Sequence, residues 1–356
     1  MGKKAGDQAS EAGKAKSTRP MTLKELAEVV GLTPGTLSVV LNNTHRASTI
    51  PEETKQRIFK AAQDHNYRPN YFARSLRANR SFTIGVIAAE LSDGYCSMIL
   101  NGIASGSIKQ GYSYLNTNHL HQPELLAQSS QMLIQRQVEG IITIDTKFHF
   151  ECDLPIVSIA GHEEIDGVTN IVLDHQRAAE LGIGHLVELG HRQIAVIKGQ
   201  DFSSDSQIRW EAIAQAAADR EVPIDEDLVV QLEGINPSPE VGYVAVKKLL
   251  AKGHFFTAIF AFNDISAIGA ISALQEAGLR VPTDVSIIGF DDIYIAPYNH
   301  PSLTTIRQPL FEMGELATQT LLKRILVSDN DQEDVPKFLT VEPELIVRNS
   351  TAKAKE

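Results

Sequence analysis

Short β-branched and aliphatic runs alternate with helical segments along most of this chain, from Phe82 to Phe290. The runs read FTIGVIA, YSYLNT, GIITID, NIVLD, QIAVIKG, LVVQLEG, AIFAF and VSIIGF. Strands that alternate with helices are typical of parallel sheets covered by helices on both faces. The pattern restarts after residues 155–160. The sequence therefore predicts two doubly wound α/β lobes.

Polar residues follow several of these runs. Open α/β sheets bind ligands outside the carboxyl ends of their strands, so these positions predict a polar cleft. Each residue alone could instead be a helix N-cap or an Asx turn. The candidates are Asn116, Asp145, Asn263 and Asp291. Arg209 could add a planar fork of donors to the cleft, with Trp210 as a stacking face, although a surface ion pair would equally explain the arginine.

Residues 22–42 predict a separate helical unit near the N-terminus. Thr22 and Glu25 have the spacing of a capping box, and Gly31 suits the left-handed end of a first helix. Thr33 can cap a second helix with Pro34 at its first position. This is the outline of a helix-turn-helix, although any surface pair of helices would give a similar pattern.

The residues that follow favour DNA binding. A third helix from about Pro51 would complete a three-helix unit, and residues 66–80 carry four arginines among apolar or neutral neighbours. The chain has a net charge of −11, yet residues 1–80 hold 14 of its 33 Lys and Arg and 7 of its 44 Asp and Glu. The remainder holds 19 basic and 37 acidic residues, which predicts a basic DNA module on an acidic body.

Composition limits the other function classes. Cys96 and Cys152 are far apart and lack metal-site spacing, so neither a disulfide framework nor a zinc motif is expected. Residues 1–20 lack the apolar core of a signal peptide and predict a disordered tail. We therefore expect a cytoplasmic, nucleoid-associated protein without cofactor, metal, catalytic residues or membrane contact.

Over residues 22–350 the chain resembles the LacI/GalR bacterial transcription regulators. The resemblance is carried by TLKELAEVVGLTPGTLSVVLN, NYRPN, ARSLR, HLVELGHRQIAVIKG, AFND, VPTDVSIIGFDD, PSLTTIRQP and LIVRNS, in that order. Between the disordered tail expected from composition (1–20) and a short tail (351–356), it implies a helix-turn-helix domain (21–65), a hinge helix segment (66–80) and an effector-binding and dimerisation domain (81–350). Within 81–350, the first lobe would comprise about 81–174 and 308–338, and the second 175–307 and 339–350.

The resemblance implies a homodimer that binds a pseudo-palindromic operator. Leu76 would be the wedge that enters the minor groove and kinks the DNA, although ordinary packing is the alternative. The expected DNA-binding residues are Thr22, Thr33, Pro34, Gly35, Thr36, Ser38, Val39, Asn42, His45, Arg46, Tyr67, Asn70, Ala73, Arg74, Leu76 and Arg77.

The resemblance also implies a small effector, commonly a sugar or sugar derivative, between the lobes. Arg209, Asn263 and Asp291 match positions that hold it, and Tyr95 or Trp210 could cover an apolar sugar face. With Asn116 and Asp145 these residues form the expected effector site. Ala160 stands where a polar contact is frequent, which puts the usual sugar geometry in doubt.

Two further features shape the expected function. Many family members carry an arginine where this chain has Val39, which could touch a thymine methyl but cannot bind guanine in a bidentate manner, so unusual half-sites are expected. The final TAKAKE lacks an apolar heptad, so a dimer is expected rather than a tetramer. The alternatives are a solute-binding protein of the periplasmic type and an enzyme that uses Asp291 with Asp292, or His185 with His191.

Overall fold

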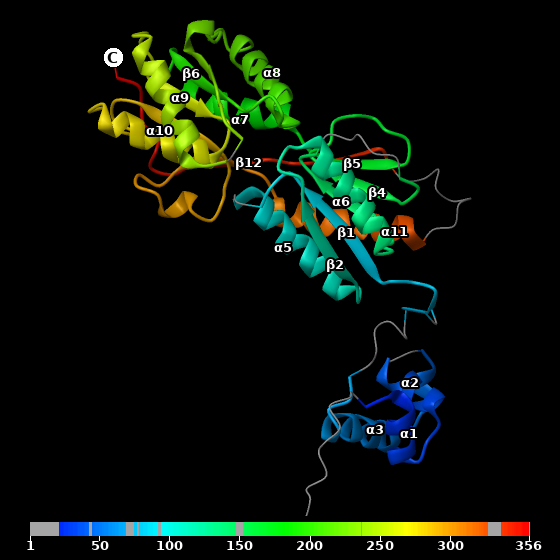
Figure 1. Cartoon of the computed structure of the whole chain (residues 1–356). Helices are drawn as coiled ribbons and strands as arrows, with labels where there is room; N and C mark the ends of the chain where they lie inside the picture. Colours follow the sequence, from blue (N-terminus) through cyan, green and yellow to red (C-terminus); the bar gives the residue numbers. More distant parts are fainter. Residues whose placement is uncertain are drawn as a thin grey trace, which may run out of the picture. The chain divides into compact units, whose positions relative to one another are not determined.

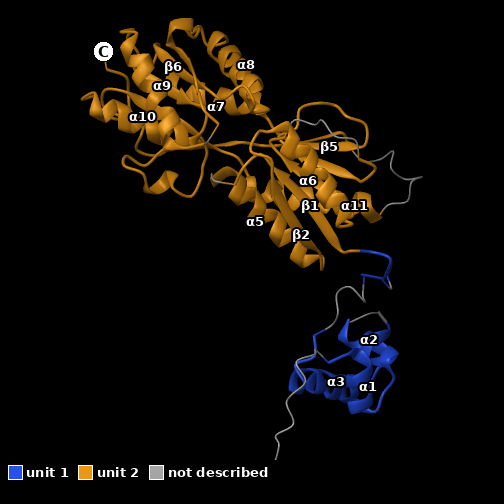
Figure 2. Ribbon diagram, viewed as in Figure 1, with its two compact units in different colours: residues 1–80 blue, residues 81–356 orange. Residues whose placement is uncertain are grey.

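The computed structural model divides into two compact units, residues 1–80 and 81–356 (Figure 2). It describes residues 21–42, 45–68, 75–76, 78–91, 94–146, 152–235, 237–326 and 336–355. No helix within these ranges is long and apolar enough to cross a membrane.

The first unit is a three-helix bundle. Its core consists of Leu26 and Ala27 on α1, Leu37 and Val40 on α2, and Ile58 on α3, each at most 2% exposed. The elements are α1 (Leu23–Val30), α2 (Pro34–Leu41), the 3-10 helix η1 (His45–Thr49) and α3 (Glu52–Asp64).

The predicted caps define where the two short helices begin and end. The Thr22 backbone N–H donates to Glu25 Oε2 at 2.7 Å, and the Glu25 N–H donates to Thr22 Oγ1 at 3.3 Å. Gly31 ends α1 with φ = 71°, and Thr33 Oγ1 accepts the Thr36 N–H at 3.2 Å. The capping box and the left-handed glycine fix the turn between α1 and α2.

The second unit contains two six-stranded sheets, one in each lobe (Figure 1). The strand orders are β11-β5-β4-β3-β1-β2 and β12-β10-β9-β8-β6-β7, and every pairing except β10 with β12 is parallel. The first sheet comprises β1 (Thr83–Ala88), β2 (Ser113–Asn118), β3 (Ile141–Ile144), β4 (Ile156–Ile159), β5 (Val168–Leu173) and β11 (Phe338–Val341). The second comprises β6 (Ile194–Lys198), β7 (Val229–Gln231), β8 (Ala258–Ala261), β9 (Ser286–Asp291), β10 (Thr304–Arg307) and β12 (Glu344–Ile346).

Helices cover both sheets, as the alternating pattern predicted. In the first lobe α5 packs closely against α11, and in the second α9 packs against α10 and α7 against α8. The first-lobe helices are α5 (Gly94–Lys109), α6 (Pro123–Gln135) and α11 (Leu310–Leu326). The second-lobe helices are α7 (His175–Glu188), α8 (Asp205–Ala218), α9 (Pro239–Ala251) and α10 (Asp264–Glu276), with the 3-10 turns η2 (Glu226–Leu228) and η3 (Ala296–Tyr298).

The chain passes between the lobes three times. It leaves the first sheet after β5, returns after β10 and leaves again after β11. The expected boundary at 338/339 is wrong, because Phe338–Val341 pair with β5 in the first sheet. The last crossing therefore falls between Val341 and Glu344.

Candidate functional site

A cavity lies between the two lobes, where the carboxyl ends of the strands meet. It encloses about 660 Å³, part of it open to solvent. Both lobes contribute to its wall, which includes five of the seven predicted effector residues: Tyr95, Asp145, Arg209, Asn263 and Asp291. The topology therefore brings these five together as a polar cleft.

Arg209 is part of the cavity wall and is only 3% exposed. Its Nη1 donates to the Phe262 carbonyl at 2.6 Å, and its Nη2 donates to Asp205 Oδ2 at 2.9 Å. The guanidinium carbon lies 4.5 Å from the Phe262 ring centroid and 3.7 Å from that of Phe290. The arginine is therefore not in a surface ion pair, and its two terminal nitrogens are not free to bind a ligand. It is a fixed buried cation whose Nε alone lacks a partner among the described residues.

Asp145 joins the first lobe to the second. It follows β3, and its Oδ1 accepts hydrogen bonds from the Ser204 N–H at 2.9 Å and the Ser204 hydroxyl at 2.6 Å. Burial raises the pKa of Asp145, and the nearby Asp205 carboxylate adds to that rise. The residue therefore offers the cavity a hydrogen-bond acceptor in a setting that disfavours additional negative charge.

Asn263 and Asp291 come from the ends of adjacent strands in the second lobe. Asn263 is the N-cap of α10, and its Oδ1 accepts the Ser266 N–H at 2.9 Å. Asp291 ends β9 with φ = 108°, a conformation that few residues other than glycine adopt, and Gln308 Nε2 donates to its Oδ1 at 2.7 Å. Asn263 thus has the structural role of an N-cap as well as a place in the cavity wall.

Tyr95 contributes a hydroxyl to the cavity. It lies within α5, one residue after the helix begins. Its Oη is buried and has no partner among the described residues. Burial raises the tyrosine pKa well above its usual value, and Asp205 and Asp145 add to the rise. A ligand could satisfy this buried hydroxyl.

Two predicted effector residues lie away from the cavity wall. Asn116 does not follow its strand but stands inside β2, opposite Val86, because this strand continues to Asn118. Trp210 packs against the core of the second lobe, with Lys198 Nζ 5.3 Å from its ring centroid. The structure therefore places neither side chain where a ligand in this cavity would lie.

Sequence reasoning missed several residues of the site. His121 and Phe202 form a tilted ring pair across the lobes with centroids 3.8 Å apart, and both line the cavity. No local sequence pattern predicts that the His121 and Phe202 rings lie together. Asp205 precedes Arg209 by four residues on α8, a spacing that could have predicted their ion pair.

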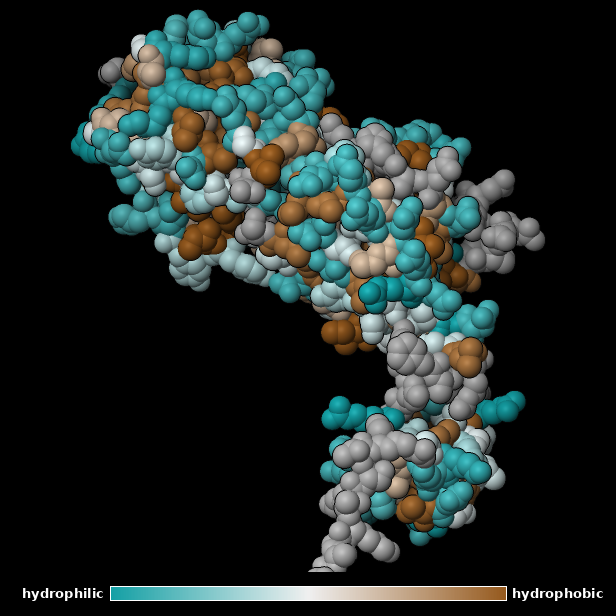
Figure 3. Space-filling view, in the orientation of Figure 1, coloured by the Kyte–Doolittle hydropathy of each residue, from teal (hydrophilic) through white to brown (hydrophobic). Residues whose placement is uncertain are grey.

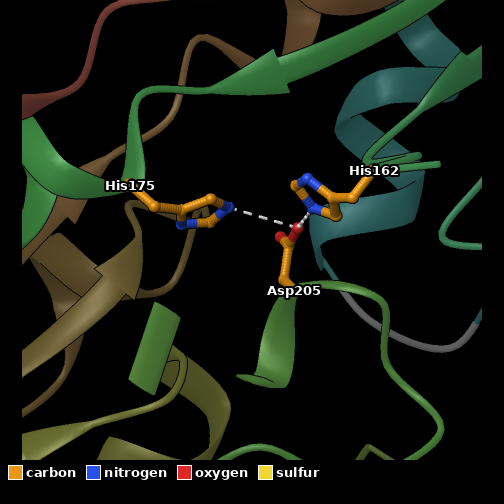
Figure 4. A group of neighbouring side chains, drawn as sticks. All are labelled: His162, His175 and Asp205. Carbon is orange, nitrogen blue, oxygen red and sulfur yellow. Dashed lines mark hydrogen bonds and ion pairs between the residues drawn. The ribbon is translucent and has the colours of Figure 1, made fainter. Parts of the chain in front are cut away.

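Asp205 also contacts two histidines (Figure 4). Its Oδ1 lies 2.7 Å from His162 Nε2 and 3.2 Å from His175 Nε2. Burial would raise the pKa of Asp205, but His175, His162 and Arg209 outweigh that effect and hold it well below the usual value. Burial lowers the pKa of His175, while the Asp205 carboxylate opposes that shift.

The groups considered for catalysis are engaged in structural contacts. Asp292 forms ion pairs with Arg307 at 2.8 Å and Arg348 at 2.6 Å. His185 is bonded to the Thr351 hydroxyl, and His191 to the Thr257 hydroxyl and the Ala352 carbonyl. None of these three side chains lines the cavity.

The described DNA-binding candidates of the first unit lie around the start of α2 and beyond it. Thr33, Pro34 and Gly35 are exposed, and Thr36, Ser38 and Val39 are half-buried. Thr22, Asn42 and Arg46 are also exposed, whereas Tyr67 packs partly against the core of the bundle. Leu76 is 86% exposed. Asn70, Ala73, Arg74, Arg77 and the side chain of His45 lie outside the described residues.

Known proteins share both parts of this architecture. Residues 22–70 match the family described as bacterial regulatory proteins, lacI family, and residues 183–351 match the periplasmic binding protein-like domain. The chain is 32% identical over 338 residues to the HTH-type transcriptional repressor PurR of Haemophilus influenzae (strain PittEE), and the match covers 92% of this chain and 98% of that protein.

Solved structures agree with these sequence matches. The lac repressor dimer bound to operator and the anti-inducer ONPF superposes with a TM-score of 0.77 at 25% identity, covering 94% of this chain and 100% of that one. A LacI family transcriptional regulator from Enterococcus faecium with bound ribose gives a TM-score of 0.65 at 29% identity, covering 77% of this chain and all of the other.

The helix-turn-helix unit, the two-lobed fold and these matches over nearly the whole chain lead to one conclusion: the protein belongs to the lacI family of bacterial regulatory proteins.

Proposed function

We propose that this protein is a transcriptional repressor that binds operator DNA as a homodimer and responds to a small ligand between its lobes. One observation carries the proposal: a capped helix-turn-helix and a polar interlobe cavity occur in the same chain. The relatives support it, since PurR of H. influenzae is named a transcriptional repressor and the lac repressor dimer was solved on operator. Binding to chromosomal DNA would place the protein in the cytoplasm, at the nucleoid.

The exposed start of α2 supplies the proposed base-reading surface. Pro34 and Gly35 are short and exposed, while Thr33 and Thr36 are bonded to each other through their hydroxyls at 2.9 Å. This surface presents few long polar side chains, so Val39 would read a thymine methyl and residues of the following turn, including Arg46, would reach the DNA backbone.

Residues 66–80 are proposed as the hinge segment. Leu76 is 86% exposed although its side chain is apolar. Such a side chain gains by leaving water, and insertion between base pairs of the minor groove would bury it. The proposed DNA-binding part of the chain thus consists of residues 21–65 and this hinge.

The cavity favours a ligand that donates hydrogen bonds. Asp145 and Asp291 present carboxyl groups, whereas both terminal nitrogens of Arg209 already have partners. Carboxylates accept hydrogen bonds only, so hydroxyl groups are suitable ligands for them. Tyr95, Phe202 and Phe262 add aromatic surface to the wall. We propose a sugar or sugar derivative, in keeping with the ribose in the E. faecium regulator.

Selection of binding sites from a random duplex pool tests the DNA-binding part of the proposal. The full-length protein is used without ligand at near-physiological salt, where nonspecific affinity is suppressed. Enrichment of a palindrome supports a repressor that binds without ligand. If no palindrome is enriched, the selection is repeated with metabolite pools to test for a corepressor, and failure there would refute the proposal.

Titration of candidate sugars tests the ligand part. Protein is titrated alone and on operator, with Asp291→Asn as the binding-site variant and Asp227→Asn, exposed in the second lobe, as the control. Coupling requires that operator and sugar change each other's affinity by the same factor. Sugar binding that is independent of Asp291 would contradict this location for the ligand.

A further inference from the structure

Three metal-ligating side chains converge beside the interlobe cavity (Figure 4). His162 follows β4 in the first lobe, while His175 and Asp205 are the first residues of α7 and α8 in the second. One ligand atom from each lies within 4.8 Å of the other two. No other three His, Cys, Asp or Glu side chains in the described ranges are gathered in this way.

The cluster is shielded from water. The side chains of His175 and Asp205 are 4% and 8% exposed, and that of His162 is 16% exposed. Asp205 lines the interlobe cavity, and His162 lines a neighbouring cavity that also contacts Ser204. The cluster is therefore buried and yet reachable by an ion through His162.

The local charge favours a cation. Asp145, Asp205 and Asp291 are close enough to act together on Tyr95, and Arg209 is the opposing charge. Asp205 is itself a buried carboxyl group, and a bound cation would offset its charge, which matters because charge is poorly tolerated in a buried setting.

We infer that His162, His175 and Asp205 form a binding site for one divalent transition-metal ion of the Zn²⁺ class. Two imidazole nitrogens and one carboxylate oxygen suit Zn²⁺, Co²⁺ or Ni²⁺, whereas Mg²⁺ and Ca²⁺ prefer oxygen ligands alone. A fourth position would be open to water or to a group of the effector.

The observed distances are close to those that a metal requires. Ligand atoms about 2.0–2.1 Å from a tetrahedral ion lie roughly 3.3 Å from one another. Asp205 Oδ1 lies 3.2 Å from His175 Nε2 and 2.7 Å from His162 Nε2. The distance between Asp205 Oδ1 and His162 Nε2 would have to lengthen by a fraction of an ångström, and His162 is the more exposed of the two histidines.

Arg209 supports this arrangement instead of competing with the ion. It binds Asp205 Oδ2, whereas both histidines face Oδ1. A partner on the second oxygen orients a ligating carboxylate, as outer contacts do at known metal sites. Because His162 belongs to the first lobe and the other two ligands to the second, the bound ion would link the lobes.

A titration with Co²⁺ tests the site through the visible absorption of the ion. Tag-free full-length protein is stripped with a chelator and dialysed, and Zn²⁺ is then used to displace the Co²⁺. We expect one Co²⁺ per chain, displaced by one Zn²⁺, and no displacement by Mg²⁺. Loss of one ligand in His162→Gln should weaken Co²⁺ binding by about 100-fold or more.

The matched control is His185→Gln, which alters a half-buried histidine that is hydrogen-bonded to Thr351 near the end of α7, ten residues after His175. It should bind Co²⁺ as the wild type does, and so should Cys152→Ser, which removes the more accessible thiol. Circular dichroism in the absence of metal establishes that each variant is folded. A Zn²⁺-induced rise in the melting temperature of the wild type gives a second readout that needs no variant.

Three results would overturn the inference: a wild-type protein that binds no Co²⁺ at micromolar concentration, equal binding by His162→Gln, or loss of binding in Cys152→Ser. Neither DNA nor sugar enters these measurements. Failure here would therefore leave the proposed repressor function intact, and failure of that function would leave the metal site standing.

Discussion

Asp264 is a single buried carboxyl group whose protonation affects the stability of this fold. It is fully buried at the start of α10, with Thr305 Oγ1 donating to its Oδ1 at 2.6 Å and the Ile293 N–H donating to its Oδ2 at 2.9 Å. Burial raises the pKa of Asp264 to about 7, although both hydrogen bonds oppose the rise. The native state therefore holds a proton that the unfolded chain has released above pH 4.

This raised pKa makes the stability of the second lobe depend on pH. Between about pH 4 and pH 7 the native state binds more protons than the unfolded state, so the free energy of unfolding falls as pH rises through this window. Asp264→Asn cannot titrate. Between pH 4 and pH 8 the free energy of unfolding of the wild type should fall by on the order of 4 kcal/mol relative to that of this variant.

Denaturant unfolding followed by fluorescence measures this difference, because Trp210, the only tryptophan, packs in the same lobe. The variant is expected to be less stable at pH 4. The Thr305 hydroxyl and the Ile293 N–H both donate to this side chain, and the amide NH₂ of asparagine would face one of these two donors instead of accepting from it. A difference between the two proteins that stays constant with pH would show that Asp264 remains ionised.

At the scale of elements, α2 is the helix that we propose reads the bases. Leu37 and Val40 fill the core, and the proposed DNA-contacting residues lie on the rest of this eight-residue helix. Val39→Ala removes the side chain proposed to touch a thymine methyl, and should relax the preference at one base pair in each half-site with little change in salt dependence.

Site selection with both proteins measures this effect. Val29→Ala is the control, because Val29 is an apolar residue on α1 that is 53% exposed and outside the proposed surface. An unchanged set of selected sites for Val39→Ala would mean that the valine makes no base contact.

The close pairing of α5 and α11 depends on glycine. A Cβ atom at Gly102 would lie 2.0 Å from the Phe311 carbonyl oxygen, and one at Gly314 would lie 2.2 Å from the Ile99 carbonyl oxygen. Neither backbone can yield without separating the helices. Gly102→Ala should destabilise the first lobe by about 1–3 kcal/mol or more, despite the better helix propensity of alanine.

Thermal unfolding provides the comparison. Ile108→Ala, on the same helix but 75% exposed, should change stability by no more than about 0.5 kcal/mol. A Gly102→Ala protein as stable as this control would contradict the close helix contact.

At the scale of the whole molecule, the face seen in Figure 3 is mixed, with teal hydrophilic areas interrupted by brown apolar residues. The layered fold beneath it could be predicted, because buried parallel strands leave continuous apolar runs in the sequence. The end of lobe one could not, because β11 is only four residues long and alternates between exposed and half-buried positions.

Part of the candidate site could also be predicted from the parallel sheets. Asp145, Asn263 and Asp291 follow or end strands, and the shared edge of a parallel sheet brings such residues together. His162 and His175 follow no comparable rule. They lie next to Asp205 only because the segment after β4 in the first lobe and the starts of α7 and α8 in the second lobe come together in the folded chain.

Ser204 joins these two lobes and gives a test of how they are held together. Its hydroxyl lies 2.6 Å from Asp145 Oδ1 and 2.5 Å from the Ala160 carbonyl oxygen, both in the first lobe. Ser204→Ala leaves two buried acceptors with one donor fewer. We expect the equilibrium between joined and separated lobes to shift toward separation by about 1–2 kcal/mol, roughly tenfold.

Small-angle scattering of the ligand-free protein measures that shift as a larger radius of gyration. Ser206→Ala is the matched control, because its hydroxyl donates to the Gly199 carbonyl at 2.8 Å within the second lobe. Each variant loses a hydroxyl donor at the start of α8, so both lose stability, but only Ser204→Ala loses a contact between lobes. If the two proteins scatter alike, the lobes are held by other contacts, such as the His121 and Phe202 ring pair.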